Sequence, residues 1–113
     1  MTEVPKVLER RPKRRKRVLL SGMIASSDGA RRFDCTIRDL TEDGARIEVH
    51  SSCMLEGQFY FLNIRDWTAH LVSVAWRSRK EIGLIFIERI ALAGALSPHH
   101  LFLKKLWLAR ATR

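Results

Sequence analysis

Two short stretches of this 113-residue chain hold residue types suited to binding one anionic ligand. The first is arginine-rich and spans 9–17, and the second is the run Asp39-Leu40-Thr41-Glu42-Asp43-Gly44. A carboxylate can accept two hydrogen bonds from the N1 and N2 donors of one guanine edge. A guanidinium fork can bridge phosphate oxygens or stack on a flat ring. We therefore expect the two stretches to close on the same ligand.

The second stretch carries the pattern D-x-T-x-x-G, formed by Asp39, Thr41 and Gly44. It lies between two alternating apolar runs, which predicts a tight corner between two strands. Thr41 could cap this corner or reach a phosphate, and we expect Gly44 to let the chain reverse with positive φ. Three fixed positions alone favour a simpler alternative, a capped turn whose Asp39 and Thr41 bond only to nearby backbone.

The first stretch offers two frames of the spacing R-x-x-x-R, Arg10 with Arg14 and Arg11 with Arg15. In an extended chain this spacing reaches about 13 Å at ~3.3 Å per residue, enough to hold different parts of one dinucleotide. The alternative is a solvated basic tail or a general polyanion binder, because a run this dense almost guarantees such a match.

The net charge of +9 is concentrated in one segment. Eight basic residues and one acidic residue lie between Lys6 and Arg17, which leaves 13 basic and 11 acidic residues elsewhere. Pro12 opposes a helix there, and like charges repel one another, so we expect a mobile arm. The length fits a single domain.

Other function classes find little support in the sequence. Cys35 and Cys53 have no neighbours at metal-ligand spacing, so we expect no metal site. No residue has a recognisable nucleophile or acid–base setting, so we expect no catalytic residue and no enzyme. The chain shows neither a signal peptide nor an apolar run of ~20 residues, which favours a cytoplasmic protein without a membrane span.

Alternation and turn residues predict six strands. Their expected ranges are 18–25, 31–39, 45–50, 58–64, 68–76 and 82–87. Asp39 continues the parity of the apolar side of its strand, which places it at the end of the inward-facing row. Asp28-Gly29 indicates a two-residue hairpin turn.

A helix is predicted over 99–110, with Ser97 as its cap and Pro98 at its first position. Its apolar residues should pack on the strands, while His99 and His100 should face solvent. The expected fold is all-β: a six-stranded antiparallel β-barrel with a basic N-terminal arm (1–17), a barrel (18–90) and a C-terminal helical segment (91–113).

The order of these features resembles the PilZ family, the bacterial cyclic di-GMP receptors. That family's motif is R-x-x-x-R followed some two dozen residues later by (D/N)-x-S-x-x-G, and Arg15 precedes Asp39 by 24 positions. Val74-Ala75-Trp76 and Gly83-Leu84-Ile85-Phe86 resemble the closing V-x-W and G-x-x-F hairpin. The resemblance covers roughly 10–88 and predicts a single-domain member with a PilZ-like barrel.

The resemblance implies a role for each matching residue. Arg11 and Arg15 would clamp the phosphates and guanines of cyclic di-GMP, with Arg10 and Arg14 as the alternative frame. The corner residues Asp39, Thr41 and Gly44 would bind a guanine edge, add a polar contact and shape the pocket, respectively. Thr41 departs from the family's usual Ser by one methyl group, which could lower affinity or change how many ligand molecules fit.

We therefore expect a receptor or adaptor with no cofactor, which binds cyclic di-GMP, orders its arm over the barrel and signals to an unidentified downstream protein. Two alternatives stay open. A basic-armed barrel that binds nucleic acid would lose affinity steeply with salt. A PilZ-like interaction module without a ligand would act through protein contacts alone.

Overall fold

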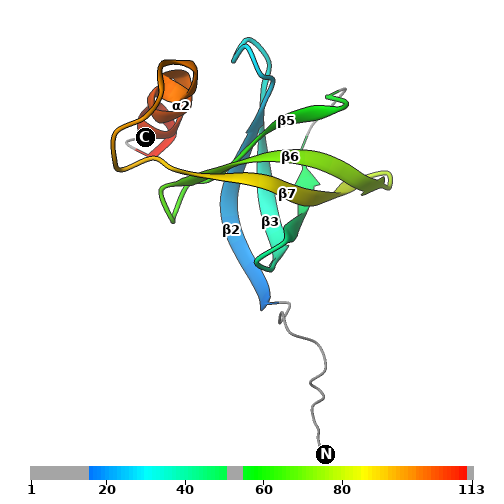
Figure 1. Ribbon diagram of the computed structural model, residues 1–113. Helices are drawn as coiled ribbons and strands as arrows, with labels where there is room; N and C mark the ends of the chain where they lie inside the picture. Colours follow the sequence, from blue (N-terminus) through cyan, green and yellow to red (C-terminus); the bar gives the residue numbers. More distant parts are fainter. Residues whose placement is uncertain (1–15, 51–54, 112–113) are drawn as a thin grey trace, which may run out of the picture.

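The computed structural model describes residues 16–50 and 55–111, with residues 16 and 17 described by their backbone only. These residues form six strands, one 3₁₀ turn and one helix (Figure 1). In chain order they are β2 (Lys16–Ala25), β3 (Arg32–Leu40), β4 (Gly44–Val49), β5 (Gln58–Asn63), β6 (Thr68–Arg77), β7 (Glu81–Ala91), η1 (Pro98–His100) and α2 (Leu101–Ala111).

The strands close into one antiparallel barrel in the order β2-β3-β4-β7-β6-β5. Each strand bonds to two neighbours, so closure leaves no edge open to a second chain. The predicted six-stranded antiparallel barrel with a C-terminal helix is confirmed. β7 extends past its predicted end at 87 because its pairing with β6 continues until Ala91 faces Thr68.

Apolar side chains gather in two clusters, one inside the barrel and one outside it. The inner cluster includes Ile24, Ile37, Ile47, Phe59 and Phe61. The outer cluster lies between the barrel wall and α2, which Figure 1 shows beside the barrel. Its buried members are Met23, Ala25, Tyr60, Leu62, Ala69, Ile90, Leu92, Leu103, Leu106 and Trp107. The helix therefore covers one wall of the barrel, as its apolar residues predicted.

The start of the helix differs from the prediction in three ways. Pro98–His100 forms a 3₁₀ turn before α2 begins at Leu101, and Ser97 makes no side-chain capping bond. The Ser97 hydroxyl instead lies 3.2 Å from Nδ1 of His100. His100 was expected in solvent but is only 7% exposed, because its ring packs edge-on against Tyr60.

The turn after β2 is longer than predicted. Ala25 pairs with Arg32, and the amide of Ser26 donates to the carbonyl of Arg31, so the connection is no two-residue hairpin. Asp28 caps this loop by accepting from Ala30 N, and only Gly29 has positive φ, at 76°. The side chain of Asp28 thus stabilises a loop that is longer than the predicted two-residue turn.

No helix within 16–50 and 55–111 has the length and apolar character needed to cross a bilayer.

Candidate functional site

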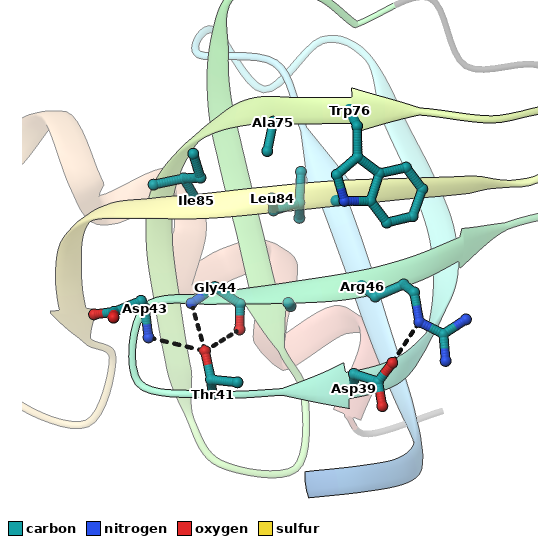
Figure 2. A pocket seen from close by; sticks show the side chains of 11 residues that line it. Asp39, Thr41, Asp43, Gly44, Arg46, Ala75, Trp76, Leu84 and Ile85 are labelled. Carbon is teal, nitrogen blue, oxygen red and sulfur yellow. Dashed lines mark hydrogen bonds and ion pairs between the residues drawn. The ribbon is translucent and has the colours of Figure 1, made fainter. Parts of the chain in front are cut away.

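The expected corner closes beside a groove on the outer face of the barrel, which we call the outer pocket (Figure 2). Its volume is about 230 Å³. It is lined by Asp39, Thr41, Asp43, Gly44, Ala45, Arg46, Ala75, Trp76, Gly83, Leu84 and Ile85. The structure therefore brings Asp39, Thr41 and Gly44 together.

A shift in strand register decides where Asp39 points. Ile37 pairs with Ile47, but Asp39 pairs with Arg46, so Arg38 is the extra residue of a bulge in β3. Cross-strand partners share one face of a sheet. Asp39 is consequently on the outer face with Arg46, not in the inward row that simple alternation predicted.

Asp39 is nonetheless buried, with 2% of its surface exposed. Its Oδ2 accepts a hydrogen bond from Nε of Arg46, and Nη1 of the same guanidinium donates to Glu81 at 2.5 Å. The hydrogen bond to Asp39 is the main cause that raises the pKa of Arg46. Within the described part of the chain, Oδ1 of Asp39 is buried and has no hydrogen-bond partner. This carboxylate can therefore accept one more donor.

Thr41 uses its hydroxyl to hold the corner (Figure 2). Its Oγ1 accepts from the amides of Asp43 and Gly44 at 3.1 Å each and donates to the carbonyl of Gly44 at 3.3 Å. The capped-turn alternative is thus correct for Thr41, while Asp39 bonds to a side chain and not to nearby backbone. A Ser hydroxyl could make the same three contacts.

The expected reason for Gly44 was wrong. The described residues with positive φ are Gly29, Gly57 and Trp67, so Gly44 does not reverse the chain through a left-handed conformation. A Cβ at Gly44 would lie 2.1 Å from the carbonyl oxygen of Leu84 on β7. Gly44 is needed because β4 and β7 approach closely at this point.

Trp76 also lines the pocket, although the sequence predicted it only as part of the closing hairpin and not as a site residue. Gly83 faces both Arg46 and Trp76 in the strand pairing, and a Cβ at Gly83 would meet the indole at 2.1 Å. The ring therefore lies on Gly83 with 44% of the residue exposed. Asp39, Arg46, Gly83 and Trp76 form one row across four strands. The signal in the sequence was the glycine, which leaves room for a flat ring.

The predicted arginines Arg10, Arg11, Arg14 and Arg15 lie outside the described residues. The backbone nevertheless fixes where their segment joins the barrel. Arg17 pairs with Asp39 and Lys16 pairs with Leu40 at the start of β2. The start of β2 therefore lies next to the outer pocket.

Among residues 16–50 and 55–111, no cluster of three or more His, Cys, Asp or Glu side chains could hold a metal ion. Cys35 is buried in the inner cluster, and Cys53 lies outside the described residues.

The chain was compared with known protein families and with curated proteins, and one family matched. No curated protein matches the chain significantly. The sequence profile of the PilZ domain matches residues 9–94, a span that includes both motifs and all six strands. Since this match covers most of the chain, the protein belongs to the PilZ domain family.

Proposed function

We propose that this protein is a receptor for cyclic di-GMP that binds the ligand in the outer pocket and signals to a partner protein. PilZ domains are a family of cyclic di-GMP receptors and are generally non-catalytic. The observation that carries the proposal is the row on the outer face. There a buried carboxylate, one of whose oxygens has no hydrogen-bond partner among the described residues, lies in line with an exposed indole.

The row offers two kinds of contact to a guanine. Trp76 presents a flat ring on which a base can stack, and such stacking is worth about 1–3 kcal/mol per base. Oδ1 of Asp39 requires a hydrogen-bond donor, because a buried acceptor left unpaired costs about 1–3 kcal/mol. A guanine N–H or an arginine of the arm would supply that donor.

The size of the outer pocket indicates that the barrel supplies only part of the site. Ligand pockets usually measure about 300–1,000 Å³, whereas this groove measures about 230 Å³. The arginine-rich segment before β2 would supply the remaining side of the ligand site. In the proposal, Arg11 and Arg15 (or Arg10 and Arg14 in the other frame) bind the phosphates and cover the guanines.

Signalling would follow from the same contacts. Two phosphates neutralise part of the charge of residues 1–17, and the arginines close over the ligand. The surface beside the outer pocket then changes from exposed Trp76 and Ile85 to an ordered arm. A partner protein would bind one of these surfaces in preference to the other.

The test is a calorimetric titration of the full chain with cyclic di-GMP at physiological salt. GTP, cyclic AMP and a short DNA duplex serve as competing anions. We expect saturable binding to cyclic di-GMP alone, and a loss of affinity of about tenfold or more in Arg15→Ala and in Asp39→Ala. Glu48→Ala is the matched control, because it breaks another β3–β4 ion pair, Arg38 with Glu48, outside the pocket lining.

Parent-like binding by both Arg15→Ala and Asp39→Ala would overturn the proposed site. Equal binding to every anion, lost steeply with salt, would indicate a nucleic-acid or polyanion binder. No binding to any of them would indicate an interaction module without a ligand.

A further inference from the structure

A second cavity opens at the end of the barrel, on the other side of the β3–β4 corner. We call it the barrel mouth, and its volume is about 510 Å³. It is lined by Leu40, Thr41, Glu42, Asn63, Asp66, Thr68, His70, Phe86 and Arg89. Thr41 lines both the barrel mouth and the outer pocket.

The strand register explains why the barrel mouth is polar. Phe59 and Phe61 point into the inner cluster, and alternation places Asn63, two residues further along β5, on the same side. Phe61 pairs with His70, and His70 pairs with Arg89. The apolar interior therefore ends in an amide, an imidazole and a guanidinium.

Two polar atoms at the barrel mouth are buried without a hydrogen-bond partner among the described residues, Oδ1 of Asn63 and Nδ1 of His70. Asn63 is only 3% exposed, and its Nδ2 donates to Oδ2 of Asp66 at 3.1 Å. That bond fixes the orientation of the amide, so Oδ1 is an acceptor that needs a donor. An occupant that offers acceptors alone, such as an inorganic anion, would leave it unsatisfied.

The charges and rings around the barrel mouth further restrict the kind of group that could bind there. Glu42 and Asp66 contribute two negative charges against the single positive charge of Arg89. The rings of His70 and Phe86 stack 3.8 Å apart at 11°, which gives the wall a flat aromatic element. Burial lowers the pKa of His70 to about 4, so the imidazole is neutral at physiological pH and can accept a hydrogen bond.

We propose that the barrel mouth binds a guanidinium group, supplied by an arginine of this chain's own basic arm. A guanidinium is flat, positively charged and made entirely of donors, so it satisfies Asn63, His70 and the two carboxylates together. The arm can supply this guanidinium from nearby, because Lys16 pairs with Leu40, which lines the barrel mouth. At ~3.3–3.6 Å per residue, Arg14 and Arg15 are within about 7 Å of that point along the chain.

The two cavities would then compete for the arm. Without cyclic di-GMP an arginine occupies the barrel mouth, and with the ligand the arginines move to the outer pocket. This competition rests on the proposed function, whereas binding of a guanidinium at the barrel mouth does not.

The test follows the side-chain NMR signals of His70 in the full chain without cyclic di-GMP. The parent is compared with a variant in which Arg10, Arg11, Arg14 and Arg15 are all changed to glutamine. Methylguanidinium is the probe, and methylurea is its uncharged control. We expect the variant to shift the His70 signals and methylguanidinium to return them saturably toward the parent values, with about millimolar affinity. Methylurea should have no such effect.

Variants at the rim of the barrel mouth test the proposal without removing a buried group. Asp66→Asn keeps an acceptor for Asn63, and Glu42→Gln lies at an exposed position. Each should weaken methylguanidinium binding by roughly twofold to fivefold, the worth of a partly exposed charge pair. Glu56→Gln, before β5 at the opposite end of the barrel, should leave binding unchanged.

Three results would count against the proposal. If methylguanidinium has no saturable effect on His70, or methylurea acts equally well, the barrel mouth holds water and the proposal fails. If methylguanidinium binds parent and variant equally and the variant leaves His70 unchanged, the arm is wrong as the source. If cyclic di-GMP does not bind at all, the proposed competition between the two cavities for the arm is wrong. The binding of methylguanidinium at the barrel mouth is then judged from its own titration.

Discussion

The outer pocket and the barrel mouth share Thr41 yet have opposite chemistry. In the outer pocket Arg46 forms ion pairs with both Asp39 and Glu81, although Oδ1 of Asp39 has no hydrogen-bond partner among the described residues. At the barrel mouth the buried polar atoms are uncharged, and two of them have no partner among the described residues.

The comparison shows how one sheet can line two cavities of different chemistry. Side chains alternate between its faces, so neighbouring residues of one corner reach different cavities. Asp39 lines the outer pocket and Leu40 lines the barrel mouth. The ion pairs of Arg46 hold Asp39 and Glu81 in place at the outer pocket, whereas Oδ1 of Asn63 and Nδ1 of His70 at the barrel mouth have no hydrogen-bond partner among the described residues.

The largest expected effect is on the outer pocket, from Gly44→Ala. Its methyl group would overlap the backbone carbonyl of Leu84, so β4 must move away from β7. We expect the free energy of unfolding to fall by about 2–3 kcal/mol, measured by urea denaturation. Gly94→Ala is the control, because a methyl group there would have no neighbour within 4 Å and the φ of Gly94 is not positive. Equal stability of the two variants would show that the close approach is not required.

A smaller effect is expected at the residue that the two cavities share. Thr41→Val keeps the shape but removes the oxygen that accepts from the amides of Asp43 and Gly44. The loss should be about 1–2 kcal/mol in thermal or urea unfolding. Thr41→Ser keeps that oxygen and should stay within about 0.5 kcal/mol of the parent. If Val and Ser behave alike, the hydroxyl does not hold the corner.

The smallest expected effect concerns the barrel mouth, where the free energy of unfolding should depend on His70 only below about pH 6.5. The pKa of His70 is about 4 in the folded protein against 6.5 as its ordinary value, so between these values the unfolded chain binds more protons. Stability should therefore fall as the pH drops from 6.5 toward 4. His70→Phe, which preserves a ring beside Phe86, should recover about 1 kcal/mol of this loss at pH 5, allowing for a partly exposed side chain.

The measurement is urea unfolding of parent and His70→Phe at several pH values. Above pH 6.5 the difference between the two proteins should no longer change with pH. A difference that stays constant from pH 4 to 8 would contradict the low pKa of His70.

Much of the fold could be predicted because it depends on local pattern. Alternating apolar residues gave six strands within a few residues of their ends, and the apolar side of α2 indicated that it packs on the barrel. The sequence predictions were wrong where a side-chain contact, and not the local backbone preference, decided the structure. Asp28 caps a longer loop than expected, and His100 is buried against Tyr60, a contact between residues far apart in the sequence.

The corner residues of the candidate site were predicted from the sequence, but their geometry and part of the pocket lining were not. The motif placed Asp39, Thr41 and Gly44 at one corner, which the structure confirms, whereas their ligand contacts stay a prediction. Arg46 and Trp76 were missed because a bulge after Ile37 and the contact with Gly83 bring them into the row. The bulge leaves no local pattern in the chain, whereas Gly83 is the sequence signal for the contact with Trp76.

The sequence by itself determined the strands, the corner and the concentration of basic residues between Lys6 and Arg17, because each follows from neighbouring residues and their spacing. Only the tertiary structure decided that Asp39 faces outward beside Arg46 and that Gly44 allows two strands to approach. It also decided that Asn63 and His70 meet at the barrel mouth. The physical reason is that register and close contact between strands depend on the whole closed sheet, and one extra residue in a strand exchanges its two faces.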